Sequence, residues 1–323
     1  MITTRLPTLT LLLLSATMLI GCRQEVSPAW QHGDIAFASN RDHGNPYGPL
    51  FMMSGDGKRW APIQGSRPSI PGGPSWLPDS SVLAFVDFYN FNPNDHARSG
   101  ILLLVDENDQ TSRVPFGPCR FFPAWAPNGD HLAFYTECDG QSALAIADPI
   151  GADEISLVDD LPLRRTPEGD YRMRITWSPD SQALAYDRRI ADDEYEIWTV
   201  NVDGTGNRRV TSGKDPAWSP ASDEIAFVRE EDIWIHSLDS GEERLFLDDP
   251  VRAEWPEWSP DASELAFMSW RDVEESSDKL RSPNVEIYKI RLEDGKLTNL
   301  TRNPAWDGYP AWRGTAVSAS QPP

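Results

Sequence analysis

One stretch of this 323-residue sequence reads Pro256-Glu257-Trp258-Ser259-Pro260-Asp261-Ala262-Ser263-Glu264-Leu265-Ala266-Phe267, and versions of it recur along the chain. Five complete copies share a tryptophan placed seven residues before a Leu/Ile-Ala-Phe/Tyr triplet; their tryptophans are Trp76, Trp125, Trp177, Trp218 and Trp258. Partial copies stand at the two ends, as Ile35-Ala36-Phe37 and Pro310-Ala311-Trp312. The triplets lie 40 to 52 residues apart. Self-similarity at such a period indicates a repeat architecture.

Each repeat contains four runs that are typical of strands. Strand a holds the Pro-x-Trp segment and strand b holds the triplet. Strand c is a β-rich run, found at residues 50–53, 101–104, 144–146, 197–200, 233–235 and 287–290. Strand d follows a tight-turn dipeptide such as Asp56-Gly57, Asp203-Gly204 or Asp294-Gly295. Short strands separated by regular turn signals, without helical periodicity, predict an all-β fold.

Six b strands and six c strands predict a six-bladed β-propeller of four-stranded antiparallel blades. A closed ring leaves only short, protected strand edges, which suits a chain this rich in strands. The inner strand of the first blade has two possible sources, Pro310-Ala311-Trp312 and Pro28-Ala29-Trp30. Because Trp30 lies five residues before Ile35 rather than seven, we favour the C-terminal copy.

The repeat resembles the TolB-type (WD40-like, PD40) β-propeller repeat, whose units read roughly P-x-W-S-P-D-G-x-x-I-A-F. The resemblance covers residues 34–314. Serine replaces the usual glycine at Ser80 and Ser181, and Ala221 replaces the usual aspartate. The resemblance implies a partner that is an envelope protein or a peptidoglycan-associated protein.

Residues 1–21 are interpreted as a lipoprotein signal peptide, because Arg5 precedes an apolar run at residues 9–20 that is short for a bilayer span. The run ends in Leu19-Ile20-Gly21-Cys22, which resembles the bacterial lipoprotein box and implies lipidation of Cys22. An ordinary signal with an incidental cysteine is the alternative. Residues 22–33 would form a lipidated tether, 34–314 the propeller and 315–323 a C-terminal tail. Arg23, where inner-membrane lipoproteins often carry Asp, favours an outer-membrane protein facing the periplasm if the source is Gram-negative.

The formal net charge is −21, from 29 basic and 50 acidic residues. Polyanions such as nucleic acid repel a body of this charge, as does an anionic membrane surface. Nucleic acid is therefore excluded as a partner, and contact with a membrane is expected through the lipid anchor only. We expect a monomeric propeller.

Loop lengths indicate which face binds a partner. The a–b and c–d connections keep nearly constant lengths, whereas the step from the strand-b aromatic to strand c varies from 6 to 20 residues. The b–c and d–a connections share one face, and variable loops on a rigid scaffold commonly carry binding. This variable face is predicted to bind a protein through Tyr47, Phe88, Tyr89, Phe91, His96, Arg164, Arg165, Tyr171, Trp270 and Trp306.

Catalytic motifs are missing from the sequence. The five histidines are scattered, and there is no G-x-S-x-G motif or phosphate-binding glycine loop. A non-enzymatic module without metal or cofactor is therefore expected. Acidic loops such as Glu230-Glu231-Asp232 lack the spacing of a Ca²⁺ loop, so a solvated charged surface is the favoured interpretation. The alternative is a carbohydrate-binding or lyase-like propeller with a site in its central channel; oligogalacturonate lyases use this propeller type but need clustered metal-binding histidines.

Two cysteines in the third repeat suggest a disulfide. In a two-residue Asn128-Gly129 hairpin, residues whose numbers sum to 257 lie opposite each other, so Cys119 would face Cys138. An exported compartment permits oxidation. Two buried thiols are the alternative.

Overall fold

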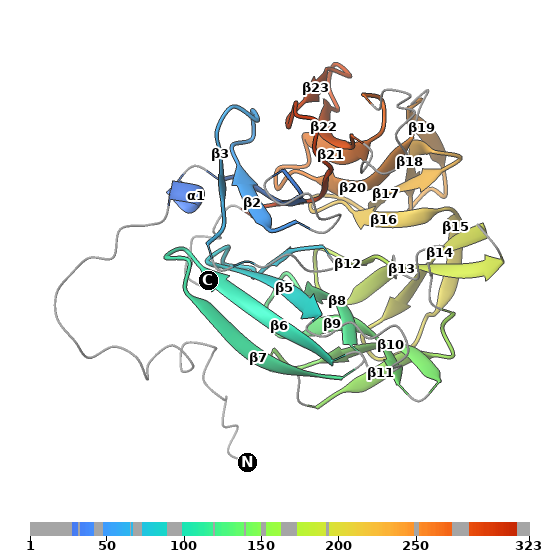
Figure 1. The fold of residues 1–323 in the computed structure, drawn as a ribbon. Coiled ribbons are helices and arrows are strands. Elements are labelled where there is room, and N and C mark those ends of the chain that lie inside the picture. The colour runs from blue at the N-terminus through green and yellow to red at the C-terminus, as the bar shows by residue number, and fades with distance from the viewer. Residues whose placement is uncertain are drawn as a thin grey trace, which may run out of the picture.

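Twenty-four strands and the four-residue helix α1 (Pro28–Gln31) make up the regular structure of the described chain. The structure is a computed structural model that describes residues 28–31, 33–41, 48–64, 66, 73–88, 99–118, 120–138, 140–149, 153–162, 173–191, 194–248, 252–272 and 284–314. The strands form six antiparallel four-stranded sheets arranged in a ring (Figure 1). This confirms the predicted six-bladed propeller.

Strands are given from the inner strand a to the outer strand d. Blade 1 holds β24 (Asp307–Trp312), β1 (Ile35–Ser39), β2 (Leu50–Met53) and β3 (Trp60–Pro62); blade 2 holds β4 (Ser75–Trp76), β5 (Val82–Phe88), β6 (Ser99–Asp106) and β7 (Thr111–Pro118); blade 3 holds β8 (Arg120–Trp125), β9 (Leu132–Cys138), β10 (Gln141–Ala147) and β11 (Ile155–Asp159). Blade 4 holds β12 (Ile175–Trp177), β13 (Ala183–Ala191), β14 (Glu194–Asn201) and β15 (Arg208–Ser212); blade 5 holds β16 (Lys214–Trp218), β17 (Glu224–Arg229), β18 (Asp232–Ser237) and β19 (Glu243–Leu247); blade 6 holds β20 (Ala253–Trp258), β21 (Glu264–Ser269), β22 (Glu286–Arg291) and β23 (Leu297–Asn299).

The ring closes through the C-terminal repeat copy. Strand β24 pairs with β1, with Trp312 opposite Ile35 and Ala311 opposite Ala36. The favoured closure is therefore confirmed. Pro28-Ala29-Trp30 does not form a strand and lies in α1 instead.

The core consists of the b and c strands, which are covered on both sides by neighbouring blades. The triplet aromatics Phe37, Phe134, Tyr186, Phe227 and Phe267 have 0% of their surface exposed. This two-sided burial explains why the triplets read as continuous apolar runs rather than as alternating polar and apolar residues.

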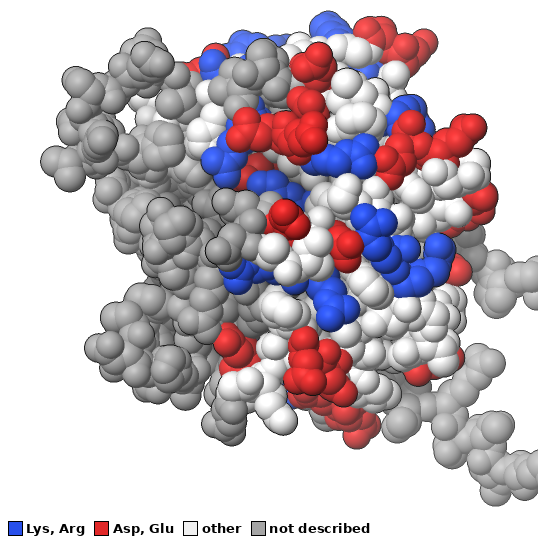
Figure 2. All heavy atoms as spheres, turned by 90° about the vertical axis from the view of Figure 1, so that its right-hand side faces the viewer, with Lys and Arg blue, Asp and Glu red and all other residues white. Residues whose placement is uncertain are grey.

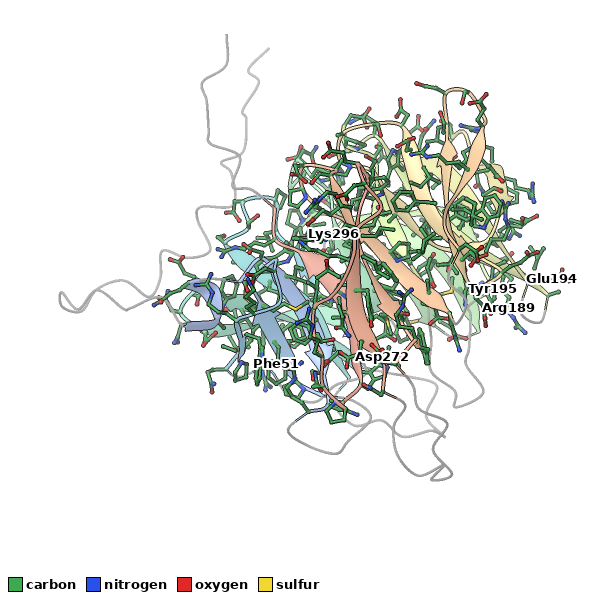
Figure 3. All side chains as sticks on the ribbon, turned by 90° about the horizontal axis from the view of Figure 1, so that it is seen from above. Phe51, Arg189, Glu194, Tyr195, Asp272 and Lys296 are labelled. Atoms are coloured by element: carbon green, nitrogen blue, oxygen red, sulfur yellow. The ribbon has the colours of Figure 1, made fainter. Side chains whose placement is uncertain are left out.

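The a–b turns are built alike and line one end of the ring, which we call the constant face. In five blades the backbone N–H of the residue after the repeat tryptophan donates to the carbonyl oxygen five positions further on; the donors are Leu77, Ala126, Ser178, Ser219 and Ser259. In Figure 3 the c–d turn residue Lys296 and the b–c residue Asp272 lie at opposite ends of blade 6. The constant and variable faces are thus the two ends of the ring.

Serine occupies the glycine position in two of these turns, where its hydroxyl group forms an additional hydrogen bond. Ser80 and Ser181 have φ values of 58° and 61°, in the left-handed region that favours glycine. The Ser80 hydroxyl donates to the Gly314 carbonyl at 2.8 Å, and the Ser181 hydroxyl accepts from the Asn128 N–H at 3.1 Å. Each bond joins neighbouring blades.

Charges of both signs are interspersed on the outer surface of blades 4 and 5. Figure 2 shows acidic and basic groups alternating there. Arg209 pairs with Glu196 at 2.5 Å, and Arg244 pairs with Glu224 at 2.5 Å. On this described surface the acidic residues therefore do not form one continuous negatively charged patch.

Candidate functional site

Most of the predicted binding-face residues cannot be placed. Tyr47, Tyr89, Phe91, His96, Arg164, Arg165 and Tyr171 lie outside the described residues, as does Cys22. Phe88 ends β5, but its side chain is not described. The structure does not show these residues together, and their role stays a prediction.

Two predicted residues of the variable face are described. The Trp270 ring, partly buried, is covered by the Arg252 guanidinium at 4.5 Å. Trp306 is only 9% exposed, and its ring lies 5.5 Å from that of Tyr309. Its backbone N–H donates to the Asn40 side chain at 2.8 Å. Trp306 therefore supports the inner strand of blade 1 and exposes little surface for a partner.

The register of β8 and β9 differs from the one predicted for the two cysteines. Ala124 opposes Ala133 and Trp125 opposes Leu132, as the sum of 257 requires, but a bulge follows and Arg120 opposes Thr136. The simple two-residue hairpin is therefore wrong beyond that bulge. Cys138 is disulfide-bonded. Cys119 lies outside the described residues, so the pairing stays a prediction.

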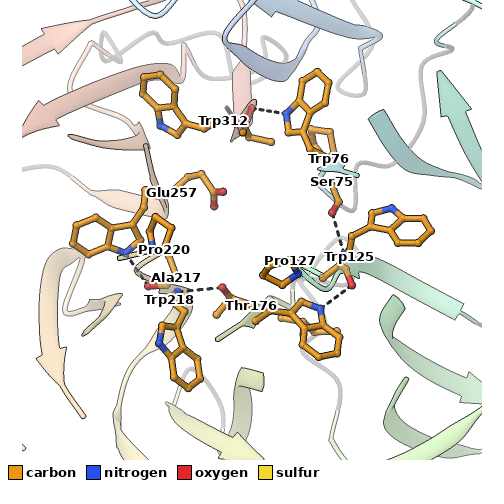
Figure 4. Close-up of a pocket in the computed structure, with 18 of the residues that line it drawn as sticks. Ser75, Trp76, Trp125, Pro127, Thr176, Ala217, Trp218, Pro220, Glu257 and Trp312 are labelled. Carbon is orange, nitrogen blue, oxygen red and sulfur yellow. Dashed lines mark hydrogen bonds between the residues drawn. The ribbon is translucent and has the colours of Figure 1, made fainter. Parts of the chain in front are cut away.

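A cavity of about 430 Å³ lies on the ring axis and reaches the a–b turns of the constant face. Its walls are the repeat tryptophans and the prolines that follow them: Trp76, Trp125, Trp177, Trp218, Trp258 and Trp312, with Pro78, Pro127, Pro179, Pro220 and Pro260 (Figure 4). We call this cavity the axial funnel. Every blade contributes equivalent residues, because each inner strand runs along the axis.

The tryptophans of the axial funnel alternate in their hydrogen bonding. The indole N–H groups of Trp76, Trp177 and Trp258 donate to the carbonyl oxygens of Ala311, Ala124 and Ala217 in the preceding blades. The indole nitrogens of Trp125, Trp218 and Trp312 are buried without a partner among the described residues.

The residues that directly precede these tryptophans in sequence follow the same alternation. Alanine precedes the unpartnered tryptophans, whereas Ser75, Thr176 and Glu257 precede the other three. The Ser75 hydroxyl accepts from the Trp125 backbone N–H at 3.3 Å, and the Thr176 hydroxyl from that of Trp218 at 3.1 Å. The ring therefore repeats in pairs of blades, and Glu257 is the departure from that pattern.

Glu257 is held by an arginine from two blades away. The Arg174 guanidinium donates to the Glu257 carboxylate and to the Pro256 carbonyl, and it lies 5.0 Å from the centre of the Trp255 ring. Arg174 is 7% exposed. Its side chain thus crosses the axis from blade 4 to blade 6 and ties these two inner strands together.

Two buried acids stand beside this arginine. The Asp187 carboxylate accepts the Arg174 backbone N–H at 3.0 Å and the Asp215 backbone N–H at 3.3 Å. Each acid is 1% exposed. Burial lowers the pKa of Arg174 to about 10, and the charges of Asp215 and Asp187 oppose that shift. The guanidinium therefore stays charged at neutral pH.

Further aromatic residues of the inner strands extend the wall of the funnel, and two of them, Phe122 and Trp255, line the cavity itself. Phe122, Trp255 and Tyr309 each stand three residues before a repeat tryptophan, with φ values of 54°, 57° and 54°. The left-handed conformation makes a bulge in each inner strand. Trp255 packs edge-on against Tyr309 with ring centres 4.8 Å apart. Sequence reasoning missed these residues, although their fixed place before the Pro-x-Trp segment was a signal.

Among the described residues that line the funnel, few side chains could act as an acid, a base or a nucleophile. No histidine lines it, and its carboxylate, Glu257, is engaged by Arg174. The described residues hold no group of three or more His, Cys, Asp or Glu side chains arranged for a metal ion. A lyase-like site in the channel thus gains no support from the residues that line it.

A second buried acidic pair lies where the ring closes, at the variable end of blades 6 and 1. The Glu286 carboxylate accepts the Asn303 N–H at 2.8 Å and the Thr301 hydroxyl. Asp307 pairs with Arg41 at 3.0 Å and accepts from the Asn303 side chain at 2.6 Å. Burial raises the pKa of Glu286 to about 7, and the nearby Asp307 and Asp272 carboxylates raise it further against the lowering hydrogen bonds.

The raised pKa of Glu286 should appear in the pH dependence of the free energy of unfolding. A carboxyl whose pKa is higher in the folded state holds a proton there that the unfolded chain has released, so stability falls as pH rises from about 4.5 to about 7. Each pKa unit corresponds to about 1.4 kcal/mol, which predicts a loss of roughly 3 kcal/mol. We expect Glu286→Gln to remove this slope in urea unfolding measured at several pH values. Identical slopes for both proteins would contradict the assignment.

No described helix is both long enough and sufficiently apolar to cross a membrane. No protein-family model matches the chain. A curated relative, the Tol-Pal system protein TolB of Alcanivorax borkumensis, is 35% identical over 104 residues, which are 31% of this chain. The match spans 22% of that relative's length.

Solved structures of TolB share the architecture. TolB from Acinetobacter baumannii superposes with a TM-score of 0.67 at 15% identity, covering 90% of this chain and 68% of the other. A structure assigned to TolB of Agrobacterium tumefaciens has a TM-score of 0.60 at 18% identity, covering 87% and 91%. At these identities the likeness establishes the fold, which is a TolB-type six-bladed propeller.

Proposed function

We propose that this TolB-type propeller is an exported, lipid-anchored binding module of the cell envelope that captures a protein partner through its variable face. The observation that carries the proposal is the contrast between the two faces. The a–b turns of five blades are closed by the same hydrogen bond, whereas the b–c connections differ severalfold in length. A rigid end and a variable end suit a scaffold that displays loops for recognition.

The relative supports the class of partner. Its name places it in the Tol-Pal system, so a peptidoglycan-associated or other envelope protein is the first partner to test. The funnel supports a binding role over a catalytic one, because the polar side chains at its base neutralise each other. Lipidation at Cys22 would keep the module at the outer membrane, facing the periplasm.

A crosslink-and-capture experiment on intact envelopes tests the proposal. Residues 89–98 of blade 2 are replaced by Asn-Gly, which closes the β5–β6 hairpin with a short turn. We expect loss of the captured protein with no loss of folding. A matched control, Asp239→Ala with Lys296→Ala on the constant face, should capture the partner normally. Equal capture by the loop variant would reject this part of the variable face, and capture of glycan without any protein would favour the carbohydrate-binding alternative.

A further inference from the structure

The segment that leads into the propeller is fastened to the constant face. The Trp30 indole N–H donates to the Asp109 carboxylate at 3.0 Å, in the c–d turn of blade 2, and Trp30 is only 2% exposed. Its ring meets that of Trp76 edge-on, with centres 5.3 Å apart. A buried aromatic with a satisfied N–H fixes this segment between blades 1 and 2.

Arg313, which follows β24 near the C-terminus, contacts the same segment. Its guanidinium lies 5.2 Å from the centre of the Trp30 ring and 5.5 Å from that of Trp76. It donates to the carbonyl oxygens of Trp30 and Ser80, each at 3.1 Å. The Arg313 backbone N–H donates to the Asp34 carbonyl at 2.7 Å.

The Asp34 side chain, at the end of the segment, also bonds to this face. The Asp34 carboxylate accepts the Gly55 N–H at 2.7 Å, in the c–d turn of blade 1. The anchoring partners named above thus lie in a–b or c–d turns, at the end of β4, or directly after β24. The described part of the docked segment begins at Pro28, six residues after Cys22. Six residues span at most about 20 Å when fully extended.

We infer that the constant face is the membrane-proximal side of the anchored protein and that the variable face points away from the membrane. The inference rests on the lipid anchor of the proposed function. It deepens that proposal, because it leaves the variable loops open to partners beyond the protein's own leaflet. It also turns the mouth of the axial funnel toward the lipid, where a large soluble partner has little access.

Energy transfer to acceptor lipids tests the orientation. The lipidated protein is inserted into phosphatidylcholine vesicles that carry an acceptor dye on the headgroup. Donor dyes are placed one at a time on Arg208→Cys and Lys296→Cys, at the constant end of blades 4 and 6, and on Glu194→Cys, at the variable end of blade 4. All three native side chains are exposed. We expect higher transfer efficiency from positions 208 and 296 than from position 194.

A longer tether provides the control. Inserting twenty Gly and Ser residues between positions 27 and 28 adds about 25 Å of mean reach while the docking contacts stay intact. The difference between the two ends of blade 4 should then shrink. Transfer from position 194 that equals or exceeds that from position 208 in the native-length protein would overturn the orientation.

The two proposals fail in different ways. Protein that does not associate with the vesicles would overturn the lipid anchor, and the orientation with it, but would leave partner capture by the variable face untouched. Protein that shows the expected orientation but captures no partner would overturn the binding proposal alone.

Discussion

Replacing Asp187 with alanine is expected to lower the free energy of unfolding by about 3–5 kcal/mol. The carboxylate is 1% exposed and accepts the backbone N–H groups of Arg174 and Asp215. Its loss would leave two buried donors without this acceptor and weaken the compensation of the buried guanidinium. Because the group is buried, added salt should restore little of the stability. Urea unfolding at pH 7 measures the loss.

Val228→Ala is the matched control, since Val228 follows the blade 5 triplet as Asp187 follows the blade 4 triplet. Val228 is also fully buried. Its truncation removes about two methyl groups and should cost about 2 kcal/mol, which is the cost of lost packing alone. If Asp187→Ala cost no more than this control, the carboxylate would be a space-filling residue and not a partner of the inner strands.

The spacing of the repeated motifs predicted the blades, because each strand is determined by residues near it in sequence. The seven-residue step from tryptophan to triplet is set by a short turn, and the fully buried triplets follow from packing between blades. The closure by Pro310-Ala311-Trp312 was predictable by elimination, because Trp30 lies five residues before Ile35 and does not fit the seven-residue turn.

The axial cluster could not be predicted in this way, because its partners meet only when the ring closes. Arg174 and Glu257 are 83 positions apart, and nothing local pairs them. Blade 4 did carry a sign of the departure, since Ile175 stands where the other copies have proline. The bulge at Phe122 was hidden too, because a left-handed non-glycine residue depends on tertiary packing. That bulge is what displaced the predicted cysteine register.

Trp258→Ala is expected to destabilise the protein by about 3–5 kcal/mol, chiefly through the cavity left between blades 5 and 6. The Trp258 ring is 5% exposed and packs within the apolar cluster that joins these blades. Its N–H bond to the Ala217 carbonyl, at 3.0 Å, is also lost. Thermal or urea unfolding measures the change. Vesicle association should be unaffected, since it depends on the proposed lipid anchor and not on the packing between blades 5 and 6.

Phenylalanine substitutions separate packing from hydrogen bonding in this ring. Trp258→Phe leaves a buried carbonyl without its donor, whereas Trp218→Phe removes an indole nitrogen that has no partner among the described residues. Because an unpaired buried polar group costs about 1–3 kcal/mol, the first variant should be the less stable by at least about 1 kcal/mol. Equal losses would mean that the six tryptophans act only by volume. A difference would show that the ring is built from pairs of blades, in which every second tryptophan bonds to its neighbour and the others only pack.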